Sequence, residues 1–300
     1  MKSVLFLIVL PIFLAVPLFL SEIPFEIEKE VLPVPLSFSV YPPIPIQGDP
    51  LMIVFEGASL GEIKAATLGS TTLSLFPYSG KTAALYGFDL NQKPGSYLIS
   101  LETADGRKIS DTLYLSARER KEEPLGITEK LGGNTAKSQA QLVASLADEN
   151  ASLADVETEI RALWSKPFIA PLASTSVTDT YGYVRLTGAY SIPHKGADFR
   201  ADIGTPVMAM NDGTVRIARE YRVYGKTVVI DHGLGLQTLY MHLSKIDVSP
   251  GENVAQGDVI GLSGSTGYAE RPHLHVSIRI GGVSIDPIVF LGLFGIYVNM

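Results

Sequence analysis

The chain has 300 residues, 46% of them hydrophobic, which is enough for two domains with their own cores and a connector. The formal net charge of -7, without a long run of Lys or Arg, argues against a nucleic-acid partner, whose binding depends on phosphate neutralisation. The chain contains no cysteine. This excludes disulfides, thiolate metal ligands and a cysteine nucleophile, and leaves His, Asp and Glu to carry any metal or acid–base chemistry.

The N-terminus has the composition of an export signal. Lys2 precedes an apolar run over residues 4–20, and the small residues typical of a cleavage site do not follow it. The run is also just long enough to cross a bilayer. We therefore expect residues 1–21 to be a signal peptide or an N-terminal membrane anchor, and the protein to lie in the periplasm or cell envelope.

Residues 34–118 are expected to form an immunoglobulin-like β-sandwich. Short apolar stretches are separated by turn residues, and at Tyr97, Ile99 and Leu101 apolar side chains alternate with polar ones. This part of the sequence contains no histidine and no metal-ligand cluster. We therefore expect it to be a spacer or a binding module.

Residues 119–166 are expected to be a helical connector. Apolar residues at alternating steps of three and four predict one helix of about 30 residues, over residues 135–164, with Glu149 interrupting one apolar site. Asn134 or Thr135 could cap this helix. We expect the helix to dock on a neighbouring domain; a binding site for a regulatory partner is the alternative.

Residues 167–290 are again strand-like and rich in glycine, and an apolar tail, residues 291–300, follows them. All five histidines of the chain lie between positions 194 and 275. This clustering indicates a site that needs imidazole groups. The tail is too short to span a membrane, so we expect it to pack on the N-terminal domain or on the connector helix.

Two short motifs combine histidine with an acid or with a second histidine. In residues 193–198, an extended backbone would place His194, Gly196 and Asp198 on one face, with Gly196 leaving room between the other two. In His273-Leu274-His275 the same alternation points both imidazoles to one side.

A third strand supplies one more imidazole. Alternation would turn Leu239, Met241 and Leu243 to one side of this strand and Tyr240 and His242 to the other. His242 can then lie near the two motifs.

Two imidazoles and one carboxylate with an open fourth position are the ligands of a catalytic zinc, whereas a structural zinc closes its shell with a fourth protein ligand. Zinc held in this way activates water and polarises a carbonyl group, and a nearby histidine can move protons. These residues therefore favour the hydrolysis of an amide.

The order His-x-x-x-Asp, strand His, His-x-His resembles the LytM/lysostaphin-type peptidases of family M23. The resemblance covers about 120 residues and includes the strings HKGADF, GTPVMAMNDGTV, VVIDHGLGLQTLYMHLS, GENVAQGDVIGLSGSTG and PHLHVSI. It implies a mainly β chain whose C-terminal domain is a two-layer antiparallel structure of the duplicated-hybrid or barrel-sandwich type, with the metal in a groove between loops.

The resemblance also implies the roles of the site residues. One Zn²⁺ ion would be held by His194, Asp198 and His275, and the catalytic histidines that do not bind the metal would be His242 and His273. The usual substrates of the family are peptide cross-links or stems of peptidoglycan. His232 falls in a turn of the family where the histidine is structural.

One loop departs from the family pattern. Residues 267–272 carry Tyr268, Glu270 and Arg271, where the family commonly has small residues. These charged side chains would either select a charged stem peptide or form a solvent-exposed pair.

We expect an exported zinc metalloendopeptidase that cleaves peptidoglycan. A wall-binding or hydrolase-activating member of the same fold without activity is the alternative, although such a protein is expected to lack a ligand and this sequence keeps all three. A peptidase acting on protein is a further alternative. A biotinyl- or lipoyl-type carrier is disfavoured because its hairpin, residues 250–259 here, would need a Lys.

Overall fold

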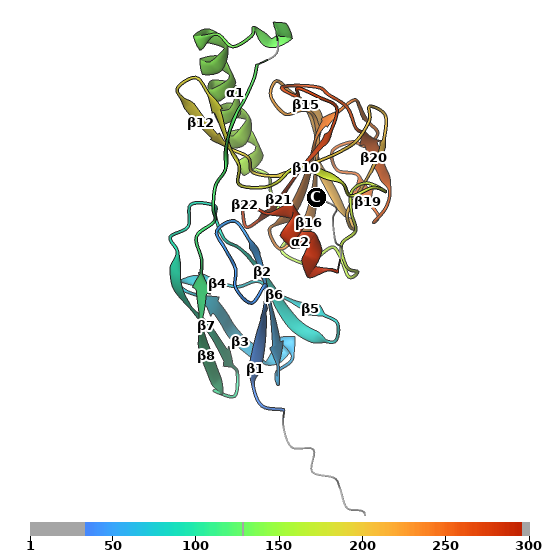
Figure 1. Ribbon diagram of the computed structural model, residues 1–300. Coiled ribbons are helices and arrows are strands. Elements are labelled where there is room, and N and C mark those ends of the chain that lie inside the picture. The colour runs from blue at the N-terminus through green and yellow to red at the C-terminus, as the bar shows by residue number, and fades with distance from the viewer. Residues whose placement is uncertain (1–33, 128, 296–300) are drawn as a thin grey trace, which may run out of the picture. The chain divides into compact units, whose positions relative to one another are not determined.

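The computed structural model describes residues 34–127 and 129–295 (Figure 1). These residues form a mainly β protein dominated by antiparallel sheets, as the sequence predicts. The signal peptide or anchor predicted at residues 1–21 lies outside the described residues. Among the helices that are described, none is long and apolar enough to cross a membrane.

Two four-stranded antiparallel sheets make up the N-terminal domain, with the orders β1-β2-β6-β5 and β4-β3-β7-β8. Ile53 and Ala84 from one sheet share a buried core with Leu68 and Leu101 from the other. The domain is therefore a β-sandwich, while its immunoglobulin-like topology stays a prediction. Its elements are β1 (Ser37–Tyr41), β2 (Pro50–Glu56), η1 (Leu60–Glu62), β3 (Ile63–Leu68), β4 (Thr71–Thr72), β5 (Leu75–Tyr78), β6 (Lys81–Gly87), β7 (Gly95–Thr103) and β8 (Lys108–Leu115).

The connector contains β9 (Glu122–Pro124), the short 3-10 helix η2 (Glu129–Leu131) and helix α1 (Ala136–Ala154). Thr135 caps α1 by accepting a hydrogen bond from the backbone N–H of Ser138 at 3.2 Å. The prediction of one helix over residues 135–164 is wrong in its second half, because α1 ends at Ala154.

The physical reason for the early end is that the next segment pairs with a strand. The backbone N–H of Glu159 donates to the side chain of Asp231, and the N–H of Leu163 donates to the carbonyl of His232. These backbone groups are thus unavailable to a helix. Ile160, which the helical pattern places on the apolar face, is 93% exposed.

Helix α1 docks on the C-terminal domain, as expected. Leu142 and Leu153 are each 1% exposed, and Leu153 packs in a cluster with Tyr221 and Met241. Glu149 does not interrupt this contact. It is buried and accepts hydrogen bonds from backbone N–H groups of the C-terminal domain.

The C-terminal domain is built around an eight-stranded sheet with the order β10-β13-β21-β17-β16-β15-β19, in which β22 pairs with β21. Two three-stranded sheets, β12-β11-β9 and β14-β20-β18, accompany it. The strands are β10 (Val177–Asp179), β11 (Val184–Thr187), β12 (Tyr190–Pro193), β13 (Ala197–Phe199), β14 (Pro206–Met208), β15 (Gly213–Tyr221), β16 (Gly225–Gly233), β17 (Leu236–Leu243), β18 (Lys245–Ile246), β19 (Asn253–Val254), β20 (Val259–Leu262), β21 (Leu274–Ile280) and β22 (Val283–Ile285).

The described part of the apolar tail packs on the N-terminal domain, one of the two expected positions. Helix α2 (Pro287–Leu293) buries Phe290 and Leu291, and the ring of Phe294 lies 6.2 Å from that of Tyr78 on β5. Beside it, Arg118 pairs with Asp49 of the sandwich at 2.7 Å and with Asp286, the cap of α2, at 3.0 Å. An apolar contact and a buried ion pair therefore join the two domains.

Candidate metal centre

Three neighbouring strands of the large sheet bring the predicted site together. In the antiparallel pairing of β13 with β21, Asp198 lies directly opposite His275. In the pairing of β21 with β17, His275 lies opposite Met241, the residue before His242. Cross-strand partners of this kind lie within about 5.5 Å of each other, so pairing alone places the side chains of Asp198 and His275 side by side and brings the backbone of His242 close to them.

His194 lies in a loop, so the prediction that residues 193–198 form one extended segment is wrong. Strand β12 ends at Pro193 and β13 begins at Ala197, so residues 193–198 do not form one extended strand. Instead, the N–H of His194 donates to the carbonyl of Tyr183 at 2.7 Å. This bond ties the loop to the preceding hairpin and turns the imidazole toward Asp198.

The absence of a side chain at Gly196 leaves room in the site, as the sequence suggests. This room is occupied mainly by the imidazole of His275. A Cβ atom at this position would lie 2.4 Å from Nε2 of His275 and 2.5 Å from the carbonyl oxygen of Val276. No larger residue fits here without moving the imidazole or the strand.

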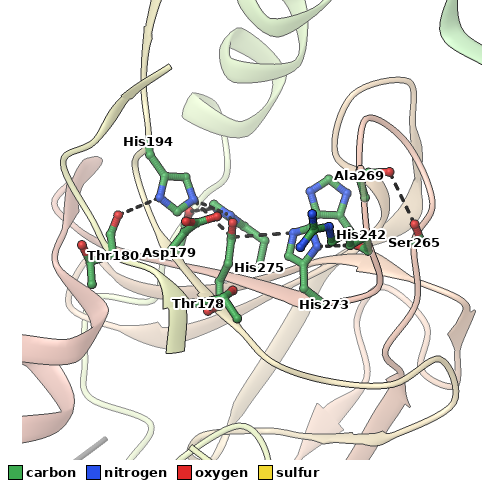
Figure 2. Close-up of polar contacts among 12 residues, drawn as sticks. Thr178, Asp179, Thr180, His194, His242, Ser265, Ala269, His273 and His275 are labelled. Atoms are coloured by element: carbon green, nitrogen blue, oxygen red, sulfur yellow. Dashed lines mark hydrogen bonds and ion pairs between the residues drawn. The ribbon is translucent and has the colours of Figure 1, made fainter. Parts of the chain in front are cut away.

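The three predicted ligands converge on one point. Nε2 of His194 lies 3.1 Å from Oδ1 of Asp198 and 3.1 Å from Nδ1 of His275, and the last two atoms are 2.6 Å apart. Figure 2 shows His194 and His275 turned toward each other, with His242 and His273 beyond them. All three ligands are less than 9% exposed.

Hydrogen bonds on the outer side of each ring fix which nitrogen faces the site. Nδ1–H of His194 donates to the carbonyl of Thr180 at 2.8 Å. Nε2–H of His275 donates to the hydroxyl oxygen of Ser277 at 3.1 Å, since that hydroxyl donates its own proton to the carbonyl of Lys195. The inward nitrogens, Nε2 of His194 and Nδ1 of His275, therefore present lone pairs.

Burial and charge favour the protonation states that a metal requires. Burial by itself would raise the pKa of Asp198, but the charge and hydrogen bonds of His194 and His275 in their protonated forms hold that pKa well below its usual range, so the carboxylate is ionised before these rings lose their protons. Burial lowers the pKa of His275 to about 4, against the opposing effect of Asp198, so this ring is neutral at neutral pH. Ionised carboxylate and neutral imidazole are the ligand forms of these groups.

This donor set fits a metal ion. Three lone-pair atoms at 2.6–3.1 Å, with the ring protons turned outward, repel one another unless a cation lies between them. Two nitrogens and one carboxylate oxygen, which lie within 4.8 Å of one another, suit Zn²⁺ with an open fourth position.

His242 and His273 stand beside this centre with their rings 4.8 Å apart. Nδ1–H of His242 donates to the carbonyl of Thr266, and Nδ1–H of His273 donates to the carbonyl of Arg271, each at 2.8 Å. Both Nε2 atoms are therefore unprotonated in the neutral rings, and that of His273 lies 3.7 Å from Oδ1 of Asp198. Burial lowers the pKa of His242 to about 3.

The backbone of His242 breaks the expected alternation. His242 has a φ of 63°, in the left-handed region, and the register between β16 and β17 shifts next to it. As a result Leu243 packs in the core with Tyr240, not with Leu239 and Met241 as alternation predicts. A strained backbone at a non-glycine residue is common at functional sites, because the surroundings must hold it there.

The remaining predictions concern His232 and the loop before His273. His232 is fully buried, with hydrogen bonds to the carbonyl of Asp212 and to Thr238, which fits the predicted structural role. Glu270 does not form an ion pair with Arg271 in the described structure; its carboxylate accepts a hydrogen bond from the backbone N–H of Gly126 in the connector at 3.0 Å.

Several residues around the site have no signal in the sequence. Strand β10 lies next to β13, with Asp179 opposite Asp198, and Thr180, the residue after β10, supplies the carbonyl that His194 binds (Figure 2). Arg185 of β11 donates to Asp198 Oδ2 at 2.8 Å. An Asp, a Thr and an Arg in or beside short strands have no distinctive sequence pattern, so only the folded chain reveals these contacts.

The large sheet therefore holds a donor set that fits a metal ion, beside two further imidazoles. Residues 192–287 match the model of peptidase family M23. The match lies where the sequence resemblance placed it.

Curated relatives match over the same segment. Peptidoglycan DD-endopeptidase ShyA of Vibrio cholerae is 48% identical over 94 residues, which are 31% of this chain and 22% of that protein. DD-carboxypeptidase/endopeptidase Mpg of Neisseria meningitidis serogroup B is 39% identical over 122 residues, 40% of this chain and 28% of that protein. This chain thus spans less than a third of the length of either relative.

A solved structure matches most of the chain. A Pseudomonas aeruginosa protein assigned to peptidase M23 aligns with a TM-score of 0.60 and 26% identity, over 84% of this chain and 96% of that one. The similarity therefore extends beyond the peptidase segment.

Proposed function

We propose that this chain is an exported zinc metalloendopeptidase that hydrolyses peptide bonds in the cross-links or stems of peptidoglycan. One observation carries the proposal: three lone-pair atoms, Nε2 of His194, Oδ1 of Asp198 and Nδ1 of His275, converge beside two further imidazoles. The names of the relatives from Vibrio and Neisseria support the substrate. The composition of residues 1–21 supports export.

In the proposed mechanism, three residues bind the metal and two histidines transfer protons. His194, Asp198 and His275 would hold one Zn²⁺ ion, which when bound activates water and polarises the scissile carbonyl. Nε2 of either His242 or His273 takes the proton of the attacking water and later passes it to the leaving amine. The other imidazole, after taking up a proton from solvent at Nε2, donates this proton in a hydrogen bond to the oxyanion of the tetrahedral intermediate.

The complete set of five residues is the argument against a wall-binding protein without activity. Binding alone does not require His242 and His273, which point unprotonated nitrogens at the site. Such a protein would bind the wall and leave its peptides uncut.

A digestion experiment tests the proposal. The purified chain is incubated with isolated peptidoglycan sacculi, with a chelator and after addition of Zn²⁺, and the released muropeptides are separated by chromatography. We expect new muropeptides only with Zn²⁺. If the unmutated chain loaded with Zn²⁺ releases none, the enzymatic function is wrong.

Variants separate the two groups of residues. His194→Ala should lose bound zinc, whereas His273→Ala should keep the metal and lose turnover. Lys64→Ala, at an exposed position of the sandwich, is the control and should keep both. Zinc content and muropeptide release are measured on the same samples.

A further inference from the structure

Arg185 lies between two carboxylates at the edge of the metal centre. Its Nη2 is 2.8 Å from Oδ2 of Asp198 and 3.3 Å from Oδ2 of Asp179. The two aspartates sit opposite each other on adjacent strands, β13 and β10, where like charges repel. The guanidinium group offsets this repulsion and holds both carboxylates in place.

Because Arg185 binds one oxygen of Asp198, the two oxygens of this carboxylate have different partners. Oδ1 faces the nitrogens of His194 and His275, while Oδ2 accepts the hydrogen bond from Arg185. Asp198 has only 4% of its side chain exposed, so water cannot replace this bond freely. A carboxylate bound in this way can offer a metal one oxygen only.

The guanidinium group of Arg185 also holds the carboxylate of Asp179 away from the metal centre. The side chain of Asp179 is 38% exposed, and its nearest described charge partner is Arg185. Without the guanidinium, this second carboxylate could turn toward a cation at the centre, or Asp198 could bind through both oxygens. Either change would add an oxygen ligand and fill the position that a substrate needs.

The backbone of Arg185 is itself fixed on both sides. Strand β11 pairs with β12, with Arg185 opposite Ile192, and with β9 of the connector, with Arg185 opposite Glu123. A planar guanidinium on a doubly paired strand is well suited to a fixed two-carboxylate contact.

We propose that Arg185 is a positioning residue of the metal centre, which holds Asp198 as a one-oxygen ligand and excludes Asp179. The proposal rests on the metal centre of the proposed function. It concerns a residue outside the predicted set His194, Asp198, His242, His273 and His275.

Binding of Co²⁺ to the metal-free full chain tests this role without an activity assay. Co²⁺ absorption in the visible range reports both occupancy and coordination number. The unmutated chain should give the intense bands of a four-coordinate ion. Arg185→Gln should bind Co²⁺ about 10- to 100-fold more weakly, the usual effect of losing an outer partner of a metal ligand, with weaker bands of higher coordination. Arg185→Lys should recover part of the affinity, because an ammonium group can still donate to Oδ2 of Asp198.

Arg216 provides a matched control. Its side chain is equally exposed, at 27%, and its Nη2 likewise joins a buried aspartate, Asp231 at 2.8 Å, and a more exposed acid, Glu159 at 3.0 Å. Arg216→Gln therefore removes a similar ion pair outside the metal centre. It should leave Co²⁺ affinity and spectrum unchanged, and circular dichroism of each metal-free variant checks the fold.

The outcomes are distinct. Unchanged affinity and spectrum in Arg185→Gln, or an equal loss in Arg216→Gln, would overturn the positioning role while leaving the metal centre intact. Absence of Co²⁺ and Zn²⁺ binding by the unmutated chain would overturn the metal centre and the positioning role together.

Discussion

The imidazoles of His242 and His273 face each other with their ring centroids 4.8 Å apart, and each is anchored by a hydrogen bond from Nδ1–H to a backbone carbonyl. Two rings that share one space and present equivalent nitrogens can serve the same tetrahedral intermediate. Their contributions to catalysis should then depend on each other.

We predict that His242→Ala and His273→Ala each lower kcat about 10²- to 10⁴-fold with the metal retained, the usual range for a positioned acid or base. The double variant should lose less than the product of the two single losses, as residues acting as one unit do. Turnover of a purified muropeptide and zinc content are measured together. Losses that multiply fully would show that the two rings act independently.

Glu149 connects helix α1 to the site. Its carboxylate oxygens accept the backbone N–H groups of Val223 at 2.8 Å and Tyr224 at 3.0 Å, and the carbonyl of Tyr224 accepts the N–H of His242 at 3.0 Å. This short chain of bonds supports the left-handed backbone of His242.

We predict that Glu149→Gln destabilises the protein by about 1–3 kcal/mol, because an amide can accept only one of the two N–H groups and leaves the other buried and unsatisfied. Turnover per folded molecule should also fall, with metal content unchanged. Urea unfolding and the muropeptide assay measure the two effects. Asp148→Asn, at the exposed neighbouring position, is the control, and an equal response there would refute a specific role of Glu149.

Gly196 should not tolerate a side chain. Gly196→Ala would put a methyl group 2.4 Å from Nε2 of His275, which must move or lose its hydrogen bond to Ser277. We expect a destabilisation of about 1–3 kcal/mol, as for other overpacked interiors, and weaker zinc binding. Gly61→Ala is the control, because a Cβ there would meet nothing within 4 Å. Normal zinc affinity in Gly196→Ala would contradict the prediction.

His232 should make the stability of the protein depend on pH. Burial lowers its pKa to about 4 from an ordinary value of 6.5. Between these values the unfolded chain binds the proton and the folded chain does not, so stability is complete above pH 6.5 and falls as pH drops toward 4. The shift corresponds to about 3 kcal/mol.

Unfolding by urea at a series of pH values from 4 to 8 measures this dependence. His232→Gln removes the titrating group and should flatten part of the acid slope, although its stability at pH 7 will be lower because the bonds to Asp212 and Thr238 are disturbed. The test is how the difference in the free energy of unfolding between the unmutated protein and His232→Gln changes with pH. If the two curves run parallel over this range, the buried neutral state of His232 is not the cause.

Local sequence patterns predicted many of the strands, because the alternation of side chains along a strand depends only on neighbouring residues. The alternation of His273, Leu274 and His275 requires only that the segment be a strand, and pairing with β13 then places His275 opposite Asp198. The apolar repeat of the connector was less informative. Its second half looks helical, but backbone bonds to Asp231 and His232 hold residues 159–163 against the sheet.

The mainly β class could be read from the sequence, since it depends on composition and short-range periodicity. The sequence also predicted two domains and, through the family resemblance, five site residues, and the structure brings these five side chains close together. The tertiary structure decided what lies around that site. The bulge at His242, the carbonyl of Thr180 behind His194 and the guanidinium of Arg185 on Asp198 all arise where segments distant in the chain meet. Contacts of this kind are set by strand order and loop path, which no local pattern encodes.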